Sequence, residues 1–277
     1  MGLGLGLRLG LGGAGVLGAA GPTYDPDAAE WFEAVEATGA TFGPDSSTVD
    51  ANKTAWSNWV IAQKNAESPI AGRSNWQQLT EPGEGYIQPM MGLSTFNVPA
   101  LFGGSEFTSF VSGDHDPALG LRGGPDRVLT ANRNWDSVPL NNVGTFAFIT
   151  ELPETDGRIW GPFAGGVRYD NLGSSGFVRS RNSTADTTST FLSGTVPRLA
   201  LVSRHLSTEY VVGNGATATT IDRVSVLAPN VPVTFFAGEG ASNTTDTRLG
   251  VVGFGRAINH EAMNTACVAL SEAITWP

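Results

Sequence analysis

The chain has 277 residues, a net charge of −10 and a pI near 4.7, and only 15% of its residues are charged. This acidic balance, with no Lys/Arg cluster in the sequence, excludes a nucleic-acid-binding surface and attraction to an anionic membrane. The 36 glycines and 16 prolines favour many short strands joined by turns, in one large domain with appendages.

Cysteine content and hydropathy bear on where the protein folds. Cys267 is the only cysteine, so the sequence predicts no internal disulfide and no zinc site, and it indicates folding in a reducing cytoplasm. No apolar run is long enough to span a bilayer, and Arg8 interrupts the first twenty residues, which argues against a signal peptide. We therefore expect synthesis in the cytoplasm without membrane insertion.

Residues 2–12 alternate between leucine and glycine, with Arg8 as the one exception. Period two is typical of a strand, and one face of this strand would be nearly bare backbone, open to close approach by another chain. Such a strand is not stable alone, so we interpret residues 1–22 as an extended arm that adds to a sheet of a neighbouring subunit. The alternative is a low-complexity tail. The docking residues would be Leu3, Leu5, Leu7, Leu9 and Leu11.

Residues 23–92 are predicted to form a helical hairpin and a linker. The first helix begins at Asp25–Pro26, an N-cap followed by a first-turn proline, and ends at Gly39. The second runs from about Thr48 to Glu67 and carries tryptophans on its buried side.

From residue 93 to 277 the pattern becomes β. Asn214–Gly215 predicts a hairpin over residues 209–220, and Asn259 predicts the start of a closing helix. Cys267 would lie on the packing face of that helix, as a small buried hydrophobe. Further strands are predicted at residues 146–152, 199–206, 224–227, 231–236 and 249–254.

Three stretches resemble laminin-G-like (concanavalin-A-like) jelly-roll domains: Leu199 through Tyr210-Val-Val-Gly-Asn214-Gly215, then Phe235-Phe236-Ala-Gly, and Leu249-Gly-Val-Val-Gly-Phe-Gly-Arg256-Ala-Ile258. The resemblance departs from the usual pattern at Pro232, and residues 93–143 match poorly. It implies a mainly β fold, a jelly-roll β-sandwich preceded by a short helical hairpin and an extended N-terminal arm.

The front half resembles phage virion and tail-fibre proteins. Those often begin with a Leu-Gly repeat, then a helix like Asp25-Pro26-Asp27-Ala28, then a second amphipathic helix. The resemblance implies a structural role, often with glycan recognition at loops of the sandwich, and assembly as a homo-oligomer, a trimer by analogy with phage fibres. It carries over no sugar-binding residue.

The sequence contains few patterns typical of catalytic or metal-binding sites. Gly10-x-Gly12-x-x-Gly15 matches a dinucleotide fingerprint but lacks the strand and helix around it, and no G-x-S-x-G is present. Asp114-His115-Asp116 has metal-like ligands, but neighbouring residues of a strand point to opposite faces. We expect no metal and no cofactor.

Acidic and aromatic residues around position 150 suggest two possible interactions with a sugar, cleavage and binding. Glu151, Glu154 and Asp156 could form a glycosidase pair, but Pro153 breaks the strand register, and we expect an acidic loop instead. The candidate glycan-contact residues, which would stack on sugar rings from loops, are Trp135, Trp160 and Tyr169. The alternative is that Trp160 and Phe163 fill the core.

The sequence thus predicts a non-enzymatic structural protein of a phage virion, either a tail-fibre or tail-tip protein or a capsid-attached fibre or decoration. Its partners would be other virion proteins, further copies of itself and host-surface polysaccharide, with no nucleic acid and no membrane. Two alternatives remain, a lectin-like carbohydrate-binding module and a glycoside hydrolase.

Overall fold

The computed structural model describes residues 22–154, 157–161, 195–237 and 244–277, and the backbone of residues 167–172, 175–180 and 187–189. The five leucines of the predicted arm, Leu3, Leu5, Leu7, Leu9 and Leu11, lie outside the described residues.

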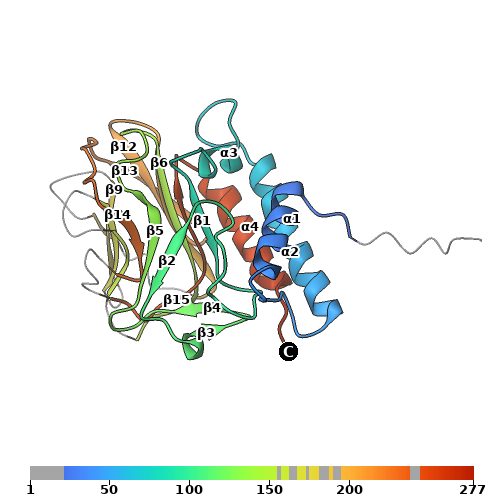
Figure 1. The fold of residues 1–277 in the computed structure, drawn as a ribbon. Helices are drawn as coiled ribbons and strands as arrows, with labels where there is room; N and C mark the ends of the chain where they lie inside the picture. Colours follow the sequence, from blue (N-terminus) through green and yellow to red (C-terminus); the bar gives the residue numbers. More distant parts are fainter. Residues whose placement is uncertain are drawn as a thin grey trace, which may run out of the picture.

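The molecule has three layers, one of helices and two of antiparallel strands (Figure 1). The helices cover the outer face of the first sheet, and the second sheet covers its inner face. The helices are α1 (Pro26–Glu36), α2 (Ser46–Asn65), α3 (Asn75–Leu79) and α4 (His260–Ala273), and one 3-10 turn spans Ser112–Asp114. This arrangement confirms the predicted sandwich with a short helical region before it.

The first sheet has the order β13-β12-β11-β6-β15-β4-β3, and β1 also pairs with β15. Its strands are β1 (Tyr86–Pro89), β3 (His115–Asp116), β4 (Gly120–Arg122), β6 (Val143–Glu151), β11 (Arg198–Arg204), β12 (Glu209–Asn214), β13 (Thr217–Asp222) and β15 (Arg248–Gly255). The second sheet has the order β10-β9-β8-β7-β14-β5-β2. Its strands are β2 (Ser105–Thr108), β5 (Val128–Asn134), β7 (Gly157–Trp160), β8 (Val167–Leu172), β9 (Ser175–Ser180), β10 (Thr187–Ser189) and β14 (Pro232–Phe235).

Each long helix begins where the sequence supplies a side-chain cap. Asp25 accepts a hydrogen bond from the Asp27 N–H, Asp45 from the Thr48 N–H at 2.9 Å, and Asn259 from the Ala262 N–H at 3.1 Å. The predicted helix starts at Asp25 and Asn259 are confirmed, and the second helix begins two residues before its predicted start.

Two apolar cores lie on the two faces of the first sheet. One joins α1, α2 and α4 to the outward side chains of β6, β11 and β15, and the other fills the space between the sheets. β6 is consequently buried over its whole length except at Glu151, as expected of a strand covered on both faces. Cys267 is fully buried on α4, and burial raises the pKa of its thiol to about 12, so the prediction of a small buried hydrophobe is confirmed.

Two parts of the chain differ from the sequence-based prediction, and in a third, residues 93–143, the prediction assigned no individual strands. The predicted strand at residues 224–227 is absent, since this described segment is irregular and leaves Val224 70% and Leu227 79% exposed. The predicted linker up to residue 92 contains a buried strand, β1. The sequence did not indicate this strand, because it has only four residues and one of them is Pro89. Residues 93–143, which matched the resemblance poorly, supply β2 to β5. No helix in the described ranges is long and apolar enough to cross a membrane.

Candidate functional site: an acidic aromatic pocket

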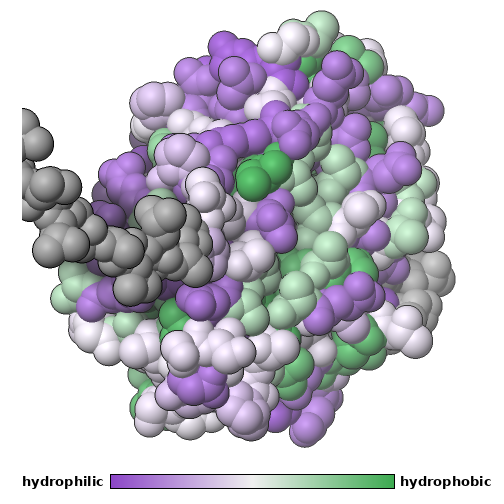
Figure 2. Space-filling model, turned by 90° about the vertical axis from the view of Figure 1, so that its right-hand side faces the viewer, coloured by the Kyte–Doolittle hydropathy of each residue, from purple (hydrophilic) through white to green (hydrophobic). Residues whose placement is uncertain are grey.

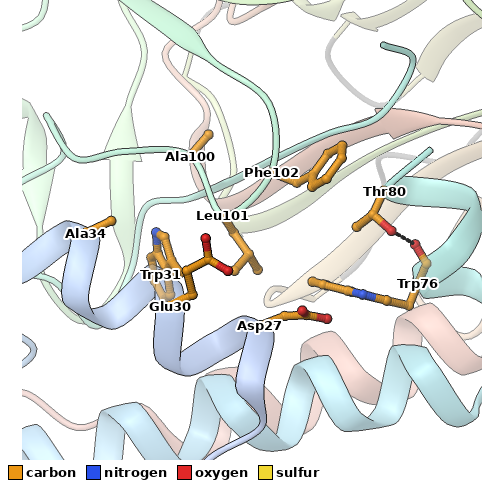
Figure 3. A pocket seen from close by; sticks show the side chains of 9 residues that line it. All are labelled: Asp27, Glu30, Trp31, Ala34, Trp76, Thr80, Ala100, Leu101 and Phe102. Carbon is orange, nitrogen blue, oxygen red and sulfur yellow. Dashed lines mark hydrogen bonds between the residues drawn. The ribbon is translucent and has the colours of Figure 1, made fainter. Parts of the chain in front are cut away.

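A pocket of about 340 Å³ opens on the side of the helical layer, between α1, the end of α3 and the segment before β2 (Figure 3). Figure 2 shows the helical face from outside, with apolar side chains gathered near its middle and a mostly hydrophilic surround. The pocket is lined by carboxylates, a hydroxyl and apolar rings, namely Asp27, Glu30, Trp31, Ala34, Trp76, Thr80, Ala100, Leu101 and Phe102.

Helical spacing puts the α1 residues of the pocket on one side of that helix. Asp27, Glu30 and Trp31 are three and four residues apart, so their side chains are neighbours on the helix surface. The Trp31 indole N–H donates to the carbonyl of Pro99 at 2.9 Å, which fixes the following segment, with Leu101, beside α1. The two carboxylates therefore stand at the edge of an apolar floor.

Trp76 is placed by the short helix α3. Ser74 and Gln77 form a reciprocal capping box at the start of this helix, which orients its first turn. The Thr80 hydroxyl donates to the Trp76 carbonyl at 2.8 Å and ends the helix, and Figure 3 shows both side chains at the same end of the pocket. Phe102 is half-buried beside Thr80, and the α1 side chains Trp31 and Glu30 lie across the pocket from them.

Lys64 of α2 controls the charge of the pocket. Its ammonium lies 2.7 Å from carboxylate oxygens of both Asp25 and Asp27, and 5.6 Å from the centre of the Trp76 ring. Burial alone would lower the pKa of Lys64, but the hydrogen bonds with the two aspartates outweigh it and raise that pKa above its ordinary value. Glu30 is exposed and makes no ion pair among the described residues, so the pocket presents one uncompensated carboxylate.

No protein-family model matches the sequence, and no curated protein sequence matches it. Among solved structures, Trypanosoma rangeli sialidase aligns over 82% of this chain and 39% of its own, at 11% identity and a TM-score of 0.47. The same sialidase in complex with sialic acid gives 12% identity and 0.46, over the same shares. The botulinum neurotoxin serotype D binding domain aligns over 67% of this chain and 51% of its own, at 6% identity and 0.46. This chain thus spans about two fifths of the sialidase, and likenesses of this size carry no argument about its function.

The pocket chemistry suits a ligand that combines an apolar face with several hydroxyl groups. Aromatic rings offer flat apolar surface, and carboxylate and hydroxyl oxygens accept or donate hydrogen bonds around it. A concave site with an apolar floor and a few convergent polar groups is typical of small-molecule binding. A sugar ring has both features.

The predicted glycan-contact residues lie elsewhere. Trp135 and Trp160 are fully buried between the sheets, and Trp135 packs edge-on against Phe254 at 5.2 Å, so neither offers a ring to a ligand from solvent. The alternative prediction, that Trp160 fills the core, is the one the structure shows. Tyr169 pairs with Trp160 across β7 and β8, but its side chain lies outside the described part of the chain, as does Phe163.

The residues on either side of Trp135 do line a surface cleft. Asn134 and Asp136 belong to an open, polar cleft of about 460 Å³ near the start of β14, together with Arg133 and Asn230. Asn134 donates to the side-chain oxygen of Asn230 across this cleft. The neighbours of Trp135 in the sequence therefore lie at a polar surface, although the tryptophan side chain itself faces the core.

The candidate metal residues are used in structural contacts. The Asp114 carboxylate pairs with Arg127 at 2.6 Å and accepts from the Val111 N–H at 2.9 Å. The His115 ring donates from Nε2 to the Met90 carbonyl at 2.9 Å, and burial lowers the pKa of this histidine. Within the described ranges no three metal-ligating side chains come together.

The candidate glycosidase acids form ion pairs at one end of the sandwich. Glu151, at the end of β6, lies 2.8 Å from Arg248 of the adjacent β15, and Glu154 lies 3.2 Å from Arg122 of β4. Both acids thus act as partners of arginines from neighbouring strands. Asp156 lies outside the described residues.

The pocket was not predicted from the sequence because its residues come from three separate segments of the chain. One local signal was available: the Ser74-x-x-Gln77 capping box predicts a helix start, and it would have placed Trp76 in the first turn of a helix. The approach of residues 100–102 to α1 has no local signature.

Proposed function

We propose that this protein is a non-catalytic, glycan-binding structural component of a bacteriophage particle, located in a tail fibre, tail tip or capsid-attached decoration. The observation that supports glycan binding is the pocket of Figure 3, where carboxylates and a hydroxyl surround an aromatic floor. The Leu/Gly arm of residues 2–12 supports the structural role, because its pattern is that of an assembly strand.

Within the pocket each group has a role in binding. The half-buried Leu101 and Phe102, together with the exposed edge of Trp76 (8% exposed), provide the apolar surface on which a sugar ring would lie, and Glu30 would accept hydrogen bonds from its hydroxyls. Lys64 holds Asp27 in place, so the site is largely formed before a ligand arrives. A preformed site loses little conformational entropy on binding.

Glycan binding is tested by exchanging single acids on α1. Glu30→Ala should weaken binding of host-surface polysaccharide by roughly tenfold to a hundredfold, because a hydrogen bond to a charged group contributes about 1.5–3 kcal/mol. Glu33→Ala is the matched control, since Glu33 is exposed on the same helix and does not line the pocket. Titration calorimetry measures both variants, and no glycan binding by the intact protein would refute this part of the proposal.

The location in a particle is tested by immunogold electron microscopy with an antibody to residues 93–277. Label at the tail would support a tail-fibre or tail-tip protein, and label over the head would support a capsid-attached decoration. Label on no particle would refute the virion role. Deleting residues 2–12 should abolish incorporation without lowering the melting temperature of the rest.

The alternative of a glycoside hydrolase makes a different prediction. It requires turnover of the bound glycan that is lost in Glu151→Gln or Glu154→Gln. We expect no turnover by the intact protein, since both carboxylates are paired with arginines across the end of the sheet.

A further inference from the structure

β13 is an edge strand without the usual protection. It is the last strand of the first sheet, and within the described part of the chain no strand pairs with its outer side. Protein edges are commonly blocked by lysine, proline or a bulge. β13 has the sequence Thr-Ala-Thr-Thr-Ile-Asp, and its six residues pair with β12 in unbroken register.

The hairpin geometry identifies the free backbone groups. β12 and β13 are joined by the two residues Gly215 and Ala216, so the first pair after the turn, Asn214 with Thr217, is hydrogen-bonded. Hydrogen-bonded and non-bonded pairs alternate along an antiparallel ladder. The N–H and C=O groups of Ala218 and Thr220 therefore point away from β12, toward an added strand.

The two faces of β13 differ in chemistry. On the inner face, Ile221 is half-buried against the core between the sheets, so an added strand could extend that core. On the outer face, Glu209 and Asp222 are directly opposite each other across the hairpin, and neither forms an ion pair among the described residues. Like charges in this position repel, and a cation beside them would be stabilising.

The segment after β13 adds exposed apolar surface on a rigid base. Val224 and Leu227 are 70% and 79% exposed. The fully buried guanidinium of Arg204 donates to the carbonyls of Leu206, Ser207, Glu209 and Arg223, at 3.0–3.4 Å. These bonds hold the surroundings of the edge in place without a partner.

Residues 2–12 of the same sequence have an apolar face, a glycine face and one positive charge, which complement the features of this edge. Leucines on one face would continue the core beyond Ile221, and glycines on the other allow close approach. If such a strand were added with its leucines facing inward, Arg8 would have the opposite parity and would lie on the outer face, which carries Glu209 and Asp222.

We propose that β13 is the acceptor for residues 2–12 of a second copy of this chain, which add to the first sheet as a further strand. This inference rests on the proposed assembly role of the arm and names its binding site. The described chain enters at the helical layer, away from β13 (Figure 1), which favours a strand from another copy over its own. The contact is head-to-tail, so copies join into a ring or a chain.

The test uses the full-length protein and light scattering after size exclusion. Thr220→Pro removes an outward N–H from the edge, whereas Thr220→Val keeps it and serves as the matched control. We expect oligomers for the intact chain and for Thr220→Val, and monomers for Thr220→Pro, at 28.9 kDa, and for the correspondingly smaller chain lacking residues 2–12.

Mixing the two monomers completes the test. The truncated chain has a free edge and Thr220→Pro has a free arm, so an equimolar mixture should form dimers whose mass is the sum of the two monomer masses. Oligomers of Thr220→Pro, or a mixture that stays monomeric, would overturn the inference. If the truncated chain also fails to enter particles while Thr220→Pro assembles normally, the arm keeps its proposed role and only the acceptor is wrong.

Discussion

The two faces of the first sheet are covered in different ways. Toward the second sheet most contacts are between apolar side chains, as where Trp135 packs edge-on against Phe254, and a hydrogen bond joins the sheets, from the Ser105 hydroxyl to the Gln88 side chain at 2.7 Å. Toward the helices, buried amides join distant segments. The Asn52 side chain donates to the carbonyls of Phe42 at 2.7 Å and Thr275 at 2.9 Å, and its oxygen accepts from the Thr275 N–H at 2.9 Å.

Further polar contacts hold the helical layer. The Trp56 indole donates to the Met91 carbonyl at 3.1 Å, and Asn75 accepts from the Asn259 N–H at 2.8 Å. Apolar cores tolerate many changes that conserve volume, whereas a satisfied buried polar network specifies one arrangement. The difference indicates that packing volume stabilises the sandwich, while hydrogen bonds position the helices and the pocket beside them.

The largest effect should come from a cavity between the sheets. Phe254→Ala removes a fully buried ring and should lower the free energy of unfolding by about 3–5 kcal/mol, measured by urea denaturation. Phe254→Leu keeps most of the volume and should cost clearly less. Equal losses in the two variants would show that volume is not what this core depends on.

An intermediate effect is expected from the amide that ties α2 to the end of α4. Asn52→Ala should cost about 2–3 kcal/mol, because it leaves buried backbone groups without partners. Asn58→Ala, an exposed position on the same helix, should change stability by about 0.5 kcal/mol or less. If Asn52→Leu were as stable as the original chain, the stability of the helical layer would depend on packing volume and not only on buried hydrogen bonds.

The smallest effect concerns pH. Burial lowers the pKa of His115 and His260 below the ordinary value of 6.5, so the unfolded chain takes up protons first as the pH falls. Their contribution to stability is full above pH 6.5 and is lost as the pH drops toward the folded pKa values. His260→Gln and His115→Gln should each reduce the fall in melting temperature between pH 7 and pH 5. An unchanged pH dependence in the double variant would contradict this assignment.

Local signals in the sequence were sufficient for the helices and the hairpin. Asp25 and Asn259 are helix caps, and Asn214–Gly215 predicts a tight turn, which the structure forms one residue later at Gly215 and Ala216, so each signal acts on its immediate neighbours. The three-layer arrangement was less accessible, because β6 is buried on both faces and its residues show no clear polar alternation.

The features that were not predicted from the sequence depend on tertiary contacts. Val224 and Leu227 have the composition of a strand, yet no partner strand covers them among the described residues, and they remain exposed. β1 is short and ends in Pro89, but it pairs with β15 and is buried. Trp135 has polar neighbours, and only the fold shows that its ring faces the core.

The position of α4 in the helical layer has a consequence for folding during synthesis. α4 packs beside α2, and the Thr275 backbone just beyond it bonds to Asn52, more than two hundred residues earlier in the chain. A ribosome completes every strand of both sheets before it releases α4. Until then the tryptophan-rich side of α1 and α2 lacks part of its cover, so the nascent chain exposes an apolar surface that a chaperone could recognise.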